Sequence, residues 1–229
     1  MQFRYEDVDA EDTPLGRLTL RRYHAETGEV GYEVRIDGHF LMASHGAHSE
    51  QAMAALARER LAGEPRPLTV LVGGLGAGHT LRAALDLPDV ERVVVVEIGA
   101  RVVDWNRRYF AEVNGDAVSD PRVAVQVGDL ADHVRATAGG VDLMLLDVDN
   151  GPGWLAAPGN AWLYEDEGVR ACLDALRPGG VLAVWSPQAN PTFRETLRRV
   201  FAVVDEVDTT ERGRAVGEPG DVIYLAHAN

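Results

Sequence analysis

Residues 70–81 read "VLVGGLGAGHTL", an apolar, strand-like run followed by closely spaced glycines and the beginning of a helix. The glycines are Gly74, Gly76 and Gly78, in the spacing Gly-x-Gly-x-Gly. Glycines between a strand and a helix allow a tight turn, and they let the backbone approach a ligand closely. These residues therefore predict a strand–turn–helix unit of a nucleotide-binding α/β fold, with a ligand site at the turn.

Four more apolar runs follow, and helix-like segments separate them. The runs cover residues 90–98, 122–129, 141–147 and 180–186. Helices are expected over residues 79–86, 100–113, 130–137, 164–176 and 191–201. Continuous apolar runs are typical of strands that are covered on both faces in a parallel sheet. The alternation predicts an α/β fold with a doubly wound, Rossmann-like sheet that is mostly parallel.

The two ends of the chain depart from this alternation. Residues 203–210 and 221–228 are strand-like with only a loop between them, which predicts an antiparallel hairpin at the C-terminal edge of the sheet. Residues 13–45 show partial alternation and turn glycines, which predicts a small N-terminal β-rich extension.

A helix is expected over residues 48–62, and the sequence "GEPRP" at 63–67 then breaks the chain. We expect two domains. The first is a small β-hairpin domain over residues 1–47, and the second is a Rossmann-like, nucleoside-binding catalytic domain over residues 48–229.

The composition restricts the partners. The 229 residues carry a formal net charge of −14, which would repel nucleic acid and anionic lipid and attract cations. No run approaches the roughly 18 apolar residues of a membrane span, and the acidic N-terminus lacks the apolar core of a signal peptide. The single Cys172 excludes an internal disulfide framework and fits a reducing compartment. We expect a cytoplasmic protein that binds small molecules and neither nucleic acid nor membranes.

Acidic residues end the next two strand-like runs. Glu97 lies about 20 residues after the glycines, where a carboxylate can accept both hydroxyls of a ribose. Gly128 and Asp129 end the following run, and Asp129 is well placed to meet an adenine amino group. Taken singly, Glu97 reads as a solvated strand-end charge and Asp129 as a helix N-cap. Their positions on successive strand ends favour an adenosine site.

The glycine spacing restricts the kinds of nucleotide that could bind at the turn. A dinucleotide site needs Gly-x-Gly-x-x-Gly, and here the third glycine comes one residue early, at Gly78. No Gly-Lys-Ser/Thr follows, which argues against a nucleoside triphosphate. Gly-x-Gly-x-Gly with a ribose-binding acid resembles the S-adenosylmethionine-binding fold.

Asp147 follows the buried run of residues 141–146 and precedes a loop of Gly, Pro and Asn. A strand end gives a rigid base, and a loop that leaves it can line a cleft, so a catalytic carboxylate is one interpretation. A simple loop cap is the other. His45, His48 and Glu50 lie close in sequence but lack a recognised metal-binding spacing, so no metal is expected.

Several stretches in order resemble the spermidine synthase (polyamine aminopropyltransferase) family over residues 13–229. They are "VVEIGARVVDWNRRYF" (95–110), "DPRVAVQVGD" (120–129), "VDLMLLDVDNGP" (141–152) with "LY" (163–164), and "LRPGGVLAVWSPQ" (176–188). The resemblance implies an aminopropyl transferase that acts on a small amine. Its donor would be decarboxylated S-adenosylmethionine or S-adenosylmethionine, and the protein would be a homodimer.

The resemblance also implies roles for single residues. Glu97 would hold the ribose and Asp129 the adenine, while Asp147 would be the catalytic acid, with Asp149 assisting. The acceptor would meet residues of the loop that follows, namely Asn150, Trp154 and Tyr164. Simple loop packing is an equal interpretation of the aromatic residues.

The chain departs from the family where amines are held. Ala77 stands where family members have an Asp that holds the aminopropyl amine, and Asn150 replaces a second Asp. The adenosine half therefore looks intact and the amine half remodelled. Two alternatives follow: an S-adenosylmethionine-dependent methyltransferase that acts on a small molecule, or a non-catalytic nucleoside-binding homologue.

Overall fold

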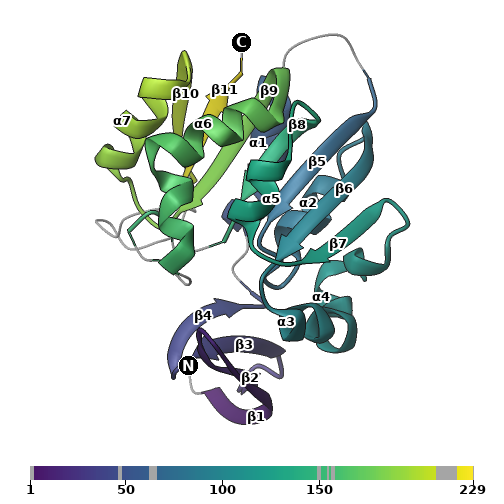
Figure 1. The fold of residues 1–229 in the computed structure, drawn as a ribbon. Coiled ribbons are helices and arrows are strands. Elements are labelled where there is room, and N and C mark those ends of the chain that lie inside the picture. Colours follow the sequence, from purple (N-terminus) through teal and green to yellow (C-terminus); the bar gives the residue numbers. More distant parts are fainter. Residues whose placement is uncertain are drawn as a thin grey trace. The chain divides into compact units, whose positions relative to one another are not determined.

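The structure of the protein is a computed structural model that describes residues 3–45, 48–61, 66–148, 151–153, 155, 158–209 and 221–228. Two sheets account for its strands, one of four strands and one of seven (Figure 1). The chain divides into two compact units, Met1–Ala47 and His48–Asn229, and each sheet belongs to one of them.

The N-terminal unit is a four-stranded antiparallel sheet in the order β1-β2-β3-β4. Its strands are β1 (Phe3–Thr13), β2 (Gly16–Ala25), β3 (Val30–Ile36) and β4 (His39–Ala43). The sequence predicted strands only from residue 13 onward, and β1 adds another before them. Its sequence "FRYEDVDAEDT" is rich in acids, which have low strand propensity. Cross-strand ion pairs compensate, since Arg21 lies 3.3 Å from Asp7 and Arg22 lies 3.1 Å from Glu6.

The second unit contains the larger sheet, in the order β10-β11-β9-β8-β5-β6-β7. Its strands are β5 (Leu68–Gly73), β6 (Val90–Glu97), β7 (Val123–Val127), β8 (Val141–Leu146), β9 (Leu176–Ser186), β10 (Val203–Asp208) and β11 (Val222–His227). The five strands from β9 to β7 pair in parallel, whereas β11 pairs antiparallel with both β9 and β10. The mostly parallel sheet with an antiparallel hairpin at its C-terminal edge is therefore confirmed.

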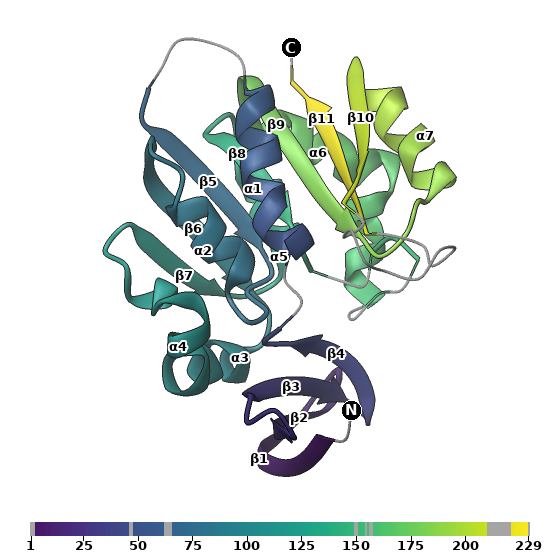
Figure 2. The same ribbon diagram turned by 180° about the vertical axis from the view of Figure 1, so that it is seen from behind.

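Helices cover both faces of this sheet. Figure 1 shows α5 (Leu130–Ala136) and α6 (Asp166–Ala175) over one face, where α7 (Pro191–Val200) packs against α6 and β10. Figure 2 shows α1 (His48–Arg60) and α2 (His79–Leu85) over the other face. Because both faces are covered, all six residues of β8 are buried.

The helix expected over residues 100–113 contains an irregular turn. It consists of α3 (Ala100–Trp105), a π-turn η1 (Asn106–Phe110) and α4 (Ala111–Asn114). The described residues also form two short 3₁₀ segments, η2 (Ala117–Ser119) and η3 (Pro158–Tyr164). None of the helices in the described part of the chain has the length and apolar character needed to cross a membrane.

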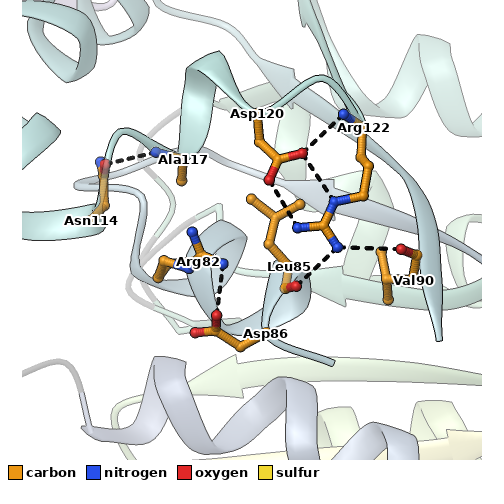
Figure 3. Close-up of polar contacts among 8 residues, drawn as sticks. All are labelled: Arg82, Leu85, Asp86, Val90, Asn114, Ala117, Asp120 and Arg122. Atoms are coloured by element: carbon orange, nitrogen blue, oxygen red, sulfur yellow. Dashed lines mark hydrogen bonds and ion pairs between the residues drawn. The ribbon is translucent and has the colours of Figure 1, made fainter. Parts of the chain in front are cut away.

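Arg122 fastens the beginning of β7 to the neighbouring elements (Figure 3). Its guanidinium donates hydrogen bonds to Asp120 and to the carbonyls of Leu85 and Val90, at 3.1 and 3.3 Å. This pairing holds the pKa of Asp120 at about 2, mainly through its hydrogen bonds with Arg122. Since Leu85 ends α2 and Val90 begins β6, these contacts join the amino ends of β6 and β7 to the end of α2.

Candidate active site

The glycine loop, residues 74–78, joins β5 to α2 at the carboxyl end of the sheet. Gly74 has φ +84°, and a Cβ atom at this position would collide with the carbonyl oxygen of Asp147. The backbone of Asp147 also donates from its N–H to the carbonyl of Gly73, at 2.9 Å. The loop and Asp147 are therefore in direct backbone contact, as their positions on adjacent strands require.

Glu97 ends β6 and braces the glycine loop. It is 8% exposed, and its carboxylate accepts hydrogen bonds from the N–H groups of Leu75, at 2.9 Å, and Gly99, at 2.7 Å. Burial raises the pKa of Glu97, while these backbone hydrogen bonds act in the opposite direction. Contact of Glu97 with a ribose stays a prediction.

Asp129 is the N-cap of α5, since its Oδ1 accepts a hydrogen bond from the N–H of Ala131, at 2.7 Å. The N–H of Gly128 donates to the carbonyl of Glu97, at 2.9 Å, so the two strand ends are joined. The helix-cap interpretation therefore describes one oxygen of Asp129. Contact with an adenine stays a prediction.

Two apolar side chains next to these acids are exposed, which the sequence pattern does not predict. Ile98 follows Glu97 and is 48% exposed, and Val127 ends β7 and is 56% exposed. Exposed apolar groups beside carboxylates suit a ligand that has a flat apolar ring and polar edges. The sequence contains no signal that separates Ile98 and Val127 from buried residues of the same runs.

Asp147 directly follows β8 and is half-buried. Its Oδ2 accepts a hydrogen bond from Oγ1 of Thr80, in the first turn of α2, at 2.8 Å. Burial and then the negative charge of Glu50 raise the pKa of Asp147 to about 7, against the opposing hydrogen bond from Thr80. A carboxyl group that titrates near neutral pH is suited to proton transfer.

Glu50, in the first turn of α1, is a neighbour of Asp147 that the sequence analysis did not connect with it. Ser49 Oγ lies 2.8 Å from Glu50 Oε2 and 2.9 Å from Asp221 Oδ2, and it accepts a hydrogen bond from Trp185 Nε1, at 3.0 Å. Trp185 lies near the carboxyl end of β9, beside β8. These contacts place the beginning of α1 at the same end of the sheet as Asp147. The long separation in sequence hid this neighbour.

The acceptor residues are only partly described. Asp149, Asn150 and Trp154 lie outside the described residues. Tyr164 ends η3, and its ring makes an edge contact with Phe193, with 5.4 Å between the centroids. Packing against the core is therefore what the structure shows for Tyr164, and contact with an acceptor stays a prediction.

Two other residues singled out in the sequence, Cys172 and Ala77, are buried. Burial raises the pKa of Cys172 to about 12, so it is a neutral thiol in the core. Ala77, in the glycine loop, is buried. In the ranges that the structure describes, no three His, Cys, Asp or Glu side chains are grouped so that they could hold a metal ion.

The fold is a doubly wound, mostly parallel α/β sheet with a glycine loop at the carboxyl end of β5. The model of the spermine/spermidine synthase domain matches residues 51–200, and the chain belongs to this family. The resemblance inferred from the sequence is thereby confirmed.

Curated relatives agree with this assignment. A polyamine aminopropyltransferase of Leptospira biflexa is 34% identical over 77% of this chain and 58% of the relative. One of a Synechococcus strain is 32% identical over 84% of this chain and 62% of the relative. Putrescine N-methyltransferase 3 of Nicotiana tabacum is 34% identical over 69% of this chain and 39% of the relative. The chain spans less than two thirds of the length of these relatives.

Solved structures show the same fold. Spermidine synthase from Thermotoga maritima has a TM-score of 0.77 and 19% identity, over 97% of this chain and 73% of the other. A spermidine synthase in complex with the transition state analogue AdoDATO has a TM-score of 0.76 and 18% identity, over 97% and 72%. These matches confirm the expected α/β class.

Proposed function

We propose that the protein is a transferase that moves an aminopropyl group from decarboxylated S-adenosylmethionine to a small amine. The observation that carries this proposal is Asp147, a carboxyl group with a pKa raised to about 7 that is fixed against the glycine loop. Family membership and the relatives named polyamine aminopropyltransferases support it.

The chemistry is a displacement at carbon. The amine nitrogen attacks the propyl carbon bonded to the sulfonium sulfur, and the carbon–sulfur bond breaks with its electron pair going to sulfur. Before the attack the acceptor ammonium gives one proton to Asp147, which frees the lone pair of its nitrogen, and the products are methylthioadenosine and a secondary ammonium. An alkyl amine has a pKa near that of lysine, about 10.4, so it is mostly protonated at neutral pH and needs such a partner. We assign Asp149 the assisting role.

The adenosine would bind along the carboxyl ends of β5, β6 and β7. The glycine loop, with Gly74, Gly76 and Gly78, would meet the nucleoside with its backbone. Glu97 would accept the ribose hydroxyls, while Gly128 and Asp129 would border the adenine. The exposed side chains of Ile98 and Val127 support this placement, because they offer apolar contacts for the ring.

The acceptor would bind beside Asp147, against the loop that carries Asn150 and Trp154 and near Tyr164. Cations suit this region, because the charge of Glu50 acts on Asp147 from the side of α1. An amine acceptor is favoured over a neutral one for this reason.

Incubation with each donor and a panel of diamines tests the proposal. Methylthioadenosine that forms from decarboxylated S-adenosylmethionine only when an amine is present is the expected result. S-adenosylhomocysteine as the sole product, formed from S-adenosylmethionine, would contradict it.

Methyl transfer from S-adenosylmethionine is the second candidate. The putrescine N-methyltransferase among the relatives supports it, since that protein has the same identity, 34%, as the first aminopropyltransferase, over 69% rather than 77% of this chain. Ala77 supports it as well. Because alanine is uncharged, nothing at that position repels the carboxylate of the full methionine tail. Formation of neither product with any amine would leave a non-catalytic nucleoside-binding homologue.

The domain division, the cellular location and the oligomeric state are also proposals. We assign the two compact units to separate domains, 1–47 and 48–229, and we place the protein in the cytoplasm because its single cysteine fits a reducing compartment. A homodimer is expected from the family resemblance, and light scattering on the purified protein gives its mass directly.

A further inference from the structure

Two buried asparagines lie under the glycine loop. Asn106 begins the π-turn η1 and Asn114 ends α4, and each is 1% exposed. Nδ2 of Asn106 donates to the carbonyl of Gly76, at 2.8 Å, and Nδ2 of Asn114 donates to the carbonyl of Ala77, at 2.9 Å. One helical segment thus holds two consecutive carbonyls of the loop.

Both side-chain N–H groups and the side-chain oxygen of each asparagine are hydrogen-bonded. Asn106 Nδ2 also donates to the carbonyl of Val102, at 3.0 Å, and Asn114 Nδ2 also donates to Asn106 Oδ1, at 2.9 Å. Asn114 Oδ1 accepts from the N–H of Ala117, at 3.1 Å. All four side-chain N–H groups therefore have acceptors, which fixes the orientation of both amides. A fully satisfied buried network of this kind is rigid.

Gly78 fits against the same pair. Its φ is +86°, and a Cβ atom at this position would collide with the amides of Asn114 and Asn106. The third glycine of the sequence pattern thus makes room for the asparagines. Gly78 and the pair form one packing unit that determines where the loop ends and α2 begins.

The π-turn brings the two asparagines onto one face of the helix. In a regular α-helix, residues eight positions apart are rotated by about 80° around the axis, whereas residues seven apart are within about 20°. A π-turn accommodates one additional residue, so Asn106 and Asn114 align although they are eight positions apart. Such turns frequently occur at functional sites.

We propose that Asn106 and Asn114 are positioning residues that hold the glycine loop in its nucleoside-binding conformation before a ligand arrives. The identity of the ligand rests on the proposed function, whereas the preformed loop does not. Three glycines with positive φ make the loop backbone intrinsically mobile, and ordering it upon binding would weaken affinity. The asparagines, together with Glu97, which accepts from the N–H of Leu75, remove that cost in advance.

Asn106→Ala and Asn114→Ala test the proposal by calorimetry with methylthioadenosine. Each variant is expected to bind about tenfold more weakly, because the lost hydrogen bonds must be replaced by ordering of the loop. In turnover assays, KM for the nucleoside donor should rise much more than kcat falls, since neither amide contacts the reacting atoms.

Thr196→Ala is the matched control. Thr196 is a buried polar residue of α7 whose Oγ1 donates to the carbonyl of Thr192, at 3.2 Å, and it does not contact the loop. This variant should lose stability and keep the wild-type affinity. Equal affinity of both asparagine variants and the control would overturn the proposal.

Hydrogen exchange of residues 74–78 in the wild-type protein tests whether the loop is ordered without ligand, even if the alanine variants fold poorly. Slow exchange of the Leu75 and Gly78 amides without ligand supports a preformed loop. Fast exchange that slows only on adding methylthioadenosine would overturn it. If the wild type does not bind methylthioadenosine, the proposed function fails, and the exchange rates still decide whether the loop is preformed.

Discussion

At the scale of single residues, Asp147 is the group on which the proposed chemistry depends. Asp147→Asn should reduce the rate of methylthioadenosine formation by roughly 100-fold or more, the usual contribution of acid–base catalysis. The fold and the nucleoside affinity should persist, because an amide oxygen can still accept the hydrogen bond from Thr80. Asp132→Asn, at an exposed acid of α5, is the control. Near-normal turnover of Asp147→Asn would return Asp147 to the role of a loop cap.

Glu97 should affect binding where Asp147 affects turnover. Glu97→Ala removes the acceptor for the Leu75 amide and the predicted ribose contact, so it should weaken methylthioadenosine binding by at least tenfold. Asp147→Asn should weaken binding less, because that side chain faces the reaction. Titration calorimetry compares the two variants directly. A Glu97→Ala protein with wild-type affinity would remove the ribose assignment.

Glu50 should set the pH dependence of the reaction. Burial of Asp147 and then the negative charge of Glu50 raise the pKa of Asp147 to about 7, so the base form of Asp147, and with it turnover, grows as the pH rises through neutrality. Glu50→Gln removes the charge, lowers the pKa of Asp147 and moves the acidic limb of the pH–rate profile to lower pH. The profile of kcat/KM measures this. A limb that stays in place would show that Glu50 does not act on the titrating group.

At the scale of elements, α5 depends on the same residue that is predicted to meet the adenine. Asp129→Ala removes the N-cap and should cost about 1 kcal/mol of stability. Asp129→Ser keeps a capping oxygen but removes the carboxylate, so it should keep stability and lose nucleoside affinity. Thermal unfolding and calorimetry on both variants separate the two roles. If Asp129→Ser binds as the wild type does, Asp129 is a cap alone.

The elements differ in how well the sequence predicts them. β5, β6 and β8 are recognisable because strands covered on both faces are continuously apolar. β1 is not recognisable, because its acids are stabilised by arginines of β2, and such pairing is not visible in a local pattern. The π-turn is hidden for a related reason. Its register depends on contacts between Asn114 and the glycine loop, far away in sequence.

Single site residues follow the same division. The positions of Glu97, Asp129 and Asp147 are predictable because parallel strands bring their carboxyl ends to one edge of the sheet, while their roles stay predictions. Glu50 is not, because only the packing of α1 against β8 and β9 brings it to Asp147. Glu97 and Asp129 also bind backbone N–H groups of the chain itself, which residue type alone does not reveal.

At the scale of the whole molecule, one end of the large sheet carries the candidate site and the other carries contacts that stabilise the fold. The carboxyl ends of the strands carry the candidate site, and the amino ends carry a buried ionic network around Asp142. This carboxylate is fully buried, contacts Arg66, accepts from the N–H of Thr69, at 2.7 Å, and lies 3.3 Å from Arg177. It joins the segments that begin β5, β8 and β9. Stability and chemistry should therefore be separable.

Asp142→Ala tests this separation. The change leaves two arginines and the Thr69 amide without their common partner, and it should lower the free energy of unfolding by about 3 kcal/mol. Arg177→Ala should cost less, about 1 kcal/mol, because Arg177 is partly exposed and Asp142 keeps Arg66 and the Thr69 amide. Urea unfolding measures both, and calorimetry at low temperature should give wild-type methylthioadenosine affinity, since the glycine loop lies at the opposite end of β5. A large loss of affinity in folded Asp142→Ala would show that the two ends are coupled through the sheet.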